Sequence, residues 1–79
     1  MQVTVRFFAG PREQLGLSEW VQELPDGATV QALADALEQS FPGLSSFRVK
    51  YAVNSAYVSL DAVLHDGDEV ACIPPVGGG

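Results

Sequence analysis

Hydrophobic and polar residues alternate along the first segment of the chain. Val3, Val5 and Phe7 are separated by polar residues, and a period of two is typical of a strand with one buried face. The pattern therefore predicts a strand over residues 2–8. Residues 18–24 predict a second strand, but its two large apolar side chains have opposite parities, so the pattern does not show which face is buried.

An amphipathic helix follows these strands. Apolar residues recur at positions i, i+3, i+4, i+7 and i+11 from Val30 to Phe41, and polar residues take the other side, as in a helix with one buried face. Thr29 is the expected N-cap, and Pro42-Gly43 ends the helix. A shorter helical turn is predicted over residues 11–15, because it begins with a proline and a glycine follows it.

Alternation returns in the second half of the chain. It runs over residues 49–53 and, after a turn at Asn54-Ser55, over residues 58–60. Asp66-Gly67-Asp68 indicates another turn, and residues 69–73 predict a last strand. The order of elements is strand, strand, helix, strand, short strand, strand. We therefore expect an α+β fold in which one main helix covers one face of a mixed sheet.

The inward faces of these elements predict one core. Its members are Val3, Val5, Phe7, Val30, Leu33, Leu37, Val53, Val58, Leu60 and Val70. A length of 79 residues leaves room for one domain, which we expect over residues 1–75, with a flexible tail over residues 76–79. Hydrophobic residues make up 47% of the chain and charged residues 18%, so the chain is expected to fold.

The charge balance narrows the class of partner. Ten acidic side chains against four basic ones give a net charge of −6, so nucleic acid and acidic membranes are disfavoured and partners are expected to offer basic surfaces. The amino end does not resemble a signal peptide, and no apolar run is long enough to cross a bilayer. We expect a cytoplasmic protein.

Side chains able to perform catalysis are sparse. Cys72 is the only cysteine and His65 the only histidine, so these residues supply neither a disulfide nor a zinc site, and we expect no bound metal. Cys72 shares the parity of Val70 on the last predicted strand, which predicts a buried, inert thiol. Residues 66–69 are expected to form a solvated turn.

The carboxyl end carries the unusual feature of the sequence. Pro74 and Pro75 hold the chain extended, and Val76 and three glycines follow, Gly77-Gly78-Gly79. Glycines make the narrowest polypeptide, able to enter a slot where any Cβ atom would clash. Such a rod presents the carboxylate of Gly79 at its tip. Because a carboxylate is inert until activated, this chemistry requires an enzyme that adenylates it.

Several stretches of the chain resemble the MoaD-like family, the small sulfur-carrier subunits of molybdopterin synthase. They are Pro74-Pro75-Val76-Gly77-Gly78-Gly79, Asp66-Gly67-Asp68-Glu69-Val70-Ala71, Val5-Arg6-Phe7-Phe8-Ala9, Arg12-Glu13 and Ala52-Val53-Asn54. Members of the family often carry Thr or Ala at the position of Gly77, a difference that costs some rigidity of the tail and changes no chemistry.

The resemblance implies a ubiquitin-like β-grasp fold and a mechanism. An E1-like enzyme uses ATP to adenylate Gly79, and a sulfur-donating enzyme completes its conversion to a thiocarboxylate. The tail, with Gly77 and Gly78, then enters the large subunit of molybdopterin synthase, where the sulfur is delivered to cyclic pyranopterin monophosphate. The implied assembly is a heterotetramer. The small subunit binds no cofactor and supplies no acid, base or other nucleophile, so it is a non-catalytic part of the synthase.

A partner-binding surface is predicted beside the tail. Phe8, Tyr57 and Ile73 have the parity opposite to the core residues of their strands, so they should point away from the core on one sheet face. Large apolar residues gathered on a surface are typical of an interface. Together with Pro74-Pro75-Val76, they are expected to contact the large subunit and the activating enzyme, as the corresponding positions of the resembled family do.

Two other kinds of function fit the sequence. One is a β-grasp sulfur carrier for thiamin thiazole, cysteine synthesis or tRNA thiolation. Thiazole carriers share the Gly-Gly end and the Asp-Gly-Asp turn, but they are usually shorter and lack the Phe-Ala-x-x-Arg-Glu stretch. The other is a ubiquitin-like module that binds without covalent chemistry, because one fold hosts many functions. This second alternative leaves the glycine tail unexplained.

Overall fold

Five strands form one mixed sheet in the computed structural model, which describes residues 1–75. The predicted tail over residues 76–79 lies outside the described residues. In chain order the elements are β1 (Gln2–Phe7), α1 (Ala9–Leu15), β2 (Glu19–Glu23), α2 (Val30–Ser40), the 3₁₀ helix η1 (Leu44–Phe47), β3 (Lys50–Val53), β4 (Ala56–Tyr57) and β5 (Glu69–Ile73).

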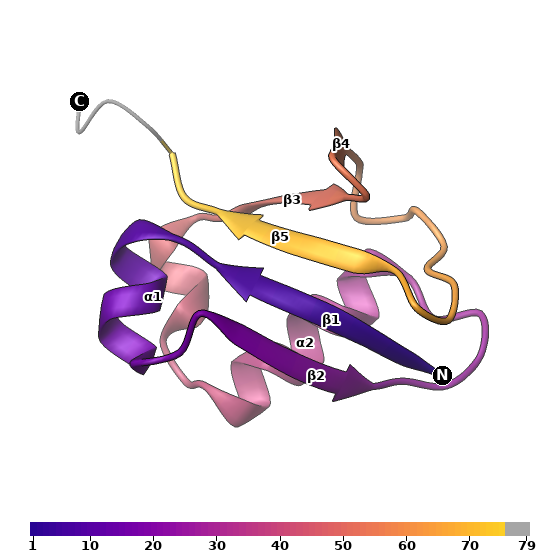
Figure 1. Cartoon of the computed structure of the whole chain (residues 1–79), viewed down its shortest axis with the longest axis horizontal. Helices are drawn as coiled ribbons and strands as arrows, with labels where there is room; N and C mark the ends of the chain where they lie inside the picture. Colours follow the sequence, from indigo (N-terminus) through magenta and orange to yellow (C-terminus); the bar gives the residue numbers. More distant parts are fainter. Residues whose placement is uncertain (76–79) are drawn as a thin grey trace.

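The strands lie in the order β2-β1-β5-β3-β4 (Figure 1). The central pair, β1 and β5, is parallel, with Val5 opposite Val70. The other neighbouring pairs are antiparallel. A parallel pair needs a long connection that crosses over one face of the sheet, and α2 lies in that connection. The sequence prediction of a mixed sheet with one main helix is confirmed.

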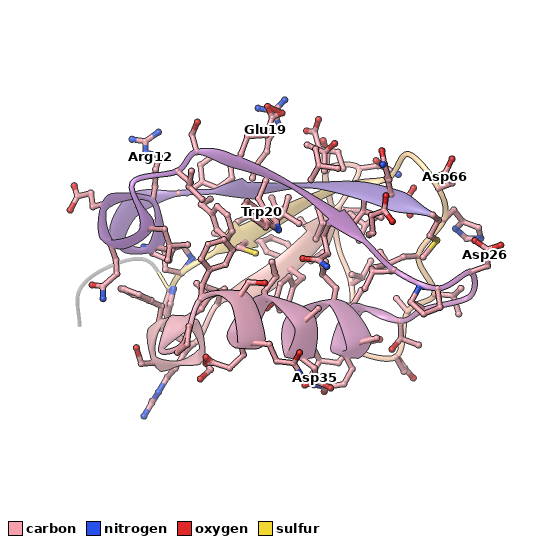
Figure 2. All side chains as sticks on the ribbon, turned by 90° about the horizontal axis from the view of Figure 1, so that it is seen from below. Arg12, Glu19, Trp20, Asp26, Asp35 and Asp66 are labelled. Carbon is pink, nitrogen blue, oxygen red and sulfur yellow. The ribbon has the colours of Figure 1, made fainter. Side chains whose placement is uncertain are left out.

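Helix α2 covers one face of the sheet and leaves the other open (Figure 2). The hydroxyl oxygen of Thr29 accepts a hydrogen bond from the backbone N–H of Ala32 at 3.3 Å, so Thr29 is the N-cap, as predicted. Leu33 and Leu37 are fully buried against the sheet. Asp35 points away from the sheet (Figure 2). The helix therefore has the amphipathic character that its pattern predicts.

Most of the predicted core is confirmed. The predicted residues that are fully buried are Val3, Val5, Phe7, Val30, Leu33, Leu37 and Val70. Val53 and Val58 are partly buried and pack against this core. Burial on this scale is the main source of stability for a small domain without disulfides.

The prediction that Leu60 belongs to the core is wrong. Its side chain is 48% exposed. Strand β4 contains only Ala56 and Tyr57, so the predicted strand over residues 58–60 does not form. The chain leaves the sheet after Val58 and runs to α2, where the carbonyl oxygen of Leu60 accepts a hydrogen bond from Gln31 N–H at 2.8 Å. Strand parity does not apply to a segment that has left the sheet.

Other residues are buried although they are not members of the predicted core. They are Leu24, Leu44, Tyr51, Ala52, Leu64 and Cys72, of which only Cys72 was predicted to be buried. Leu64, which is fully buried, lies in the connection before β5, where its backbone N–H donates to Ala28 O at 2.8 Å. Leu44 lies in η1, a segment for which the sequence analysis predicts no element.

The structure shows which face of β2 is buried. Trp20 points toward the space between the sheet and α2, whereas its neighbour Glu19 points to the open face (Figure 2). The Trp20 ring meets the Phe41 ring edge to face, with centroids 5.0 Å apart. Val21 is exposed. The aromatic pair explains why Trp20, which is partly buried, and not Val21 faces the core.

Helix α1 begins at Ala9, two residues before the predicted first position. Pro11 is tolerated inside it because the first backbone N–H groups of a helix have no partner in the helix. The C-cap Gly16 has a φ of 68°. At Gly10 a Cβ atom would lie 2.8 Å from Cε1 of Phe47, so glycine allows α1 to pack closely against η1.

Asp68 connects the turns at the start of β5. One of its carboxylate oxygens accepts a hydrogen bond from Asn54 Nδ2 at 3.0 Å, and the other accepts from the backbone N–H of His65 at 2.8 Å. Asn54 in turn accepts from the backbone N–H of Glu69 at 3.0 Å. The predicted turn is present, but the Asp68 side chain is only 12% exposed, so it is a structural group rather than a solvated one.

Replacing Asp68 with alanine is expected to lower the free energy of unfolding by about 1–2 kcal/mol, because two donors lose a charged acceptor. Urea unfolding measures the effect. Asp35→Ala is the matched control, since Asp35 is exposed on α2 and its carboxylate accepts a hydrogen bond from the exposed Gln31 side chain at 3.0 Å. Equal stability of the two variants would show that the Asp68 hydrogen bonds contribute nothing.

Candidate functional site

The parallel pairing of β1 and β5 brings two predicted partner residues to one end of the molecule. Phe7 pairs with Cys72, so Phe8 and Ile73 follow at the same end of the two strands (Figure 1). Pro74-Pro75 comes next and ends the described part of the chain. The sequence could not show this juxtaposition, because it depends on strand order rather than on parity.

The predicted outward positions are confirmed, whereas binding by these residues stays a prediction. Phe8 is 41% exposed and Tyr57 is 67% exposed, and Ile73 is half-buried. Tyr57 is paired with Ala52 on the far side of β3. Strand β3 therefore lies between Tyr57 on β4 and Ile73 on β5. Phe8 follows β1, which is the neighbour of β5 on the opposite side.

The open face of the sheet carries a row of residues with a charged side chain at one end, an aromatic ring at the other and two alanines between them. Register places Arg6, Ala71, Ala52 and Tyr57 side by side across four strands. The Arg6 Nε atom lies 3.1 Å from a Glu69 carboxylate oxygen, so its charge is balanced within the sheet. The two alanines have short apolar side chains, so no side chain protrudes from the middle of this face, and a flat partner surface can pack against it.

A groove lies beside the end of β5. It is formed by the carboxyl end of β5, the first residues of β3 and the segment that follows β4. The residues that line it are Val49, Lys50, Tyr51, Tyr57, Val58, Ser59, Leu60, Ile73, Pro74 and Pro75. Tyr57, Ile73, Pro74 and Pro75 belong to the predicted partner surface, whereas Phe8 does not line the groove. The remaining six residues were missed, because three separate segments converge only in the fold.

Burial raises the pKa of two side chains, Cys72 and Tyr51. The Cys72 side chain is fully buried, and burial raises the pKa of its thiol to about 12, so the reactive thiolate is absent at neutral pH. Burial, and then the neighbouring Cys72, raises the pKa of the Tyr51 hydroxyl above its ordinary value. The predicted burial of Cys72 is confirmed.

The acidic side chains and the histidine of residues 1–75 are spread over the molecule. The exposed His65 ring has its Nδ1 atom 3.9 Å from a carboxylate oxygen of Asp68. Within this part of the chain, no three His, Cys, Asp or Glu residues gather to hold a metal ion. The predicted reactive residue Gly79, with Gly77, Gly78 and the predicted contact residue Val76, lies outside the described residues.

No helix among the described residues has the length and apolar character needed to cross a membrane.

The fold defines a class of protein, the ubiquitin-like β-grasp proteins. The structure is similar to the crystal structure of SAMP1 from Haloferax volcanii, with a TM-score of 0.89, 27% identity and 100% of both chains covered. It is also similar to a chain in the complex of subunits 1 and 2 of molybdopterin-converting factor from Helicobacter pylori. That match has a TM-score of 0.70, 28% identity and 100% coverage of both chains.

The chain belongs to the ThiS family, whose model matches residues 5–79. A relative from Chlamydomonas reinhardtii is 41% identical, with 100% of both chains covered. Another, from Mycobacterium tuberculosis, is 40% identical, with 100% of this chain and 99% of the relative covered. Both relatives are molybdopterin synthase sulfur carrier subunits. The resemblance seen in the sequence is confirmed.

Proposed function

We propose that this chain is the sulfur carrier of molybdopterin synthesis and that the carboxylate of Gly79 carries the sulfur. The observation that supports the proposal most strongly is similarity over the full length of chains with this function, at 41% and 40% identity. The family match continues to Gly79 itself. Cys72, the only cysteine of the chain, is buried, and burial raises the pKa of its thiol, so it does not compete with Gly79 as the carrier of the sulfur.

The proposed chemistry has two steps on this chain. An E1-like enzyme transfers the adenylyl group of ATP to the Gly79 carboxylate and releases pyrophosphate. A persulfide on a sulfur-donating enzyme then attacks the acyl adenylate, and AMP leaves. A thiol cleaves the S–S bond of the resulting acyl disulfide, which leaves a thiocarboxylate on Gly79 and a disulfide on the donor. ATP is bound by the activating enzyme, and this chain needs no cofactor of its own. Because activation consumes ATP, the proposal places the chain in the cytoplasm.

The large subunit of molybdopterin synthase is the proposed receiver of the sulfur, in a heterotetramer. Pro74 and Pro75, which have a fixed φ and no backbone N–H, continue β5 at the end of the sheet. The open sheet face and the exposed Phe8 and Tyr57 lie near that end. The Helicobacter pylori complex of subunits 1 and 2 supports a partner of this kind.

A second candidate function is attachment to other proteins. The small archaeal modifier protein 3 of Haloferax volcanii is 36% identical, with 100% of both chains covered. An activated Gly79 attacked by an amine in place of sulfur would give an amide and AMP. Attachment would appear as a product heavier by one copy of this chain.

Reconstitution tests the proposed function. The chain is incubated with its activating enzyme, ATP and a sulfur donor, and then with the large subunit and cyclic pyranopterin monophosphate. We expect molybdopterin to form. If no molybdopterin forms while a thiazole or cysteine synthase consumes the same thiocarboxylated chain, the chain serves another pathway and the proposal is wrong.

Phe8→Ala is expected to weaken binding to the large subunit by more than about 1 kcal/mol, since large exposed aromatic residues often dominate interfaces. Titration calorimetry measures the affinity. The unfolding temperature should stay nearly unchanged because Phe8 is 41% exposed. Val21→Ala is the control, because Val21 is also exposed but lies on the edge strand β2. If the Phe8→Ala variant binds the large subunit as tightly as the Val21→Ala variant does, Phe8 is not part of the interface.

A further inference from the structure

The groove beside β5 contains a single charged residue. Nine of its ten lining residues are uncharged, and the tenth is Lys50. Lys50 is the only lysine of the chain. Its side chain is exposed, and among residues 1–75 it forms no ion pair. The positive charge of this groove is therefore not balanced by the described part of the chain, although the whole chain is strongly acidic.

The shape of the groove follows from the two strands that flank β3. Strand β5 pairs with β3 from Lys50 to Val53, whereas β4 pairs only with Ala52 and Val53. Beyond this pairing Val58 N–H donates to Tyr51 O at 3.1 Å, and the chain then leaves for α2. On the side of β3 that faces away from β5, Lys50 consequently has no strand beside it in residues 1–75. An unpaired strand edge between apolar walls accepts an extended segment of another protein.

A partner that covers the groove must remove water from the charged Lys50 side chain, and this desolvation restricts which chemical groups the partner can carry. A partner that lies over Val58, Leu60 and Pro74 removes water from Lys50 as well. A charge that loses water without gaining a counter-charge is strongly unfavourable. An occupant that binds tightly must therefore supply an anionic group beside the Lys50 ammonium, and in a protein segment this group is a carboxylate.

The occupant is also restricted by position. Pro74 and Pro75 line the groove, and Gly77, Gly78 and Gly79 follow them in sequence. A protein that receives the carboxyl end thus has to contact the groove or pass next to it. Under the proposed function that protein is the large subunit of molybdopterin synthase.

We propose that the groove binds an extended apolar segment of the large subunit and that a carboxylate of this segment pairs with Lys50. This inference rests on the proposed function, because it takes its partner from it. It differs from the expectation of basic partner surfaces that the net charge suggested. The net charge describes the whole chain, whereas the pairing depends on the few groups that line the groove.

Charge changes at Lys50 test the inference. We expect Lys50→Met, which keeps an apolar stem, to weaken binding of the large subunit about three- to fivefold, and Lys50→Glu to weaken it roughly tenfold or more. Binding of Lys50→Met should also depend less on salt than binding of the wild type, because one ion pair is missing. Titration calorimetry at two salt concentrations measures both quantities.

Arg48→Glu is the matched control. Arg48 is exposed and lies two positions before Lys50, but it does not line the groove. Because exposed charges outside a contact contribute little to binding, reversing the charge of Arg48 should change the affinity for the large subunit less than about twofold. Wild-type affinity of Lys50→Met and Lys50→Glu would overturn the inference. Equal weakening by Arg48→Glu would also overturn it, since the effect would then come from the overall charge.

A change in the apolar wall supplies an independent test. Leu60→Ser should weaken binding severalfold, since Leu60 lines the groove and is 48% exposed, and it should not change the unfolding temperature. A wild-type chain that fails to bind the large subunit contradicts the proposed function and the inference with it. Strong wild-type binding that Leu60→Ser leaves unchanged contradicts the inference alone.

Discussion

Deletion of Gly79 is expected to abolish sulfur transfer to the pterin. Deletion moves the terminal carboxylate back along the chain by about 3.5 Å, the length of one extended residue. Reacting groups misplaced by about 1 Å can lose a hundredfold in rate, so a shift of this size should leave no measurable transfer. The fold should be unaffected, because every core residue lies at or before Cys72. Molybdopterin formation by the reconstituted synthase measures the effect.

Extension by one residue after Gly79 should fail in the same way. Gly78→Val should fail as well, because a β-branched side chain restricts the backbone and widens a segment that must fit a narrow slot. His65→Ala is the control, since His65 is exposed and lies in a turn before β5. Molybdopterin synthesis by the deletion variant at the rate of this control would contradict the role of Gly79.

Leu33→Ala is expected to lower the free energy of unfolding by about 2–5 kcal/mol, through lost burial and the cavity left behind. Leu33 is fully buried on the face of α2 that packs against the sheet. A domain of this size often has only about 3–5 kcal/mol of stability, so a large fraction of the variant should be unfolded at room temperature. Urea unfolding followed by Trp20 fluorescence measures the change.

Leu60→Ala is the control for Leu33→Ala. The same side chain is truncated, but Leu60 is 48% exposed, and substitutions at exposed positions usually change stability by less than about 0.5 kcal/mol. A Leu33→Ala variant that unfolds at the same urea concentration as Leu60→Ala would contradict the arrangement of the core.

Periodicity predicted the elements that have one buried and one exposed face. β1, α2 and β5 follow their patterns closely, since each packs along its whole length against the core. Prediction failed at residues 58–60, where the chain leaves the sheet for α2, and at Leu64, which is buried in a connection. Tertiary hydrogen bonds determine these positions, and no local repeat in the sequence encodes such bonds.

Part of the candidate site could also be predicted from the sequence. Parity alone placed Phe8 and Tyr57 on the outside, and both are exposed. The groove could not be predicted, because it needs β3 between β5 and the segment after β4, which is a consequence of strand order. A sequence signal for Lys50 existed nevertheless: it is the only lysine in a chain of net charge −6, and its parity is that of Ala52 on the open face.

Intact-protein mass spectrometry tests the sulfur-carrier function most directly. The chain is incubated with its activating enzyme, ATP and a sulfur donor, and a parallel sample lacks ATP. We predict a mass increase equal to the exchange of one oxygen atom for one sulfur atom, located on Gly79 by fragmentation and absent without ATP. An unmodified Gly79 in the complete system, or sulfur located on any other residue, would contradict the proposed function.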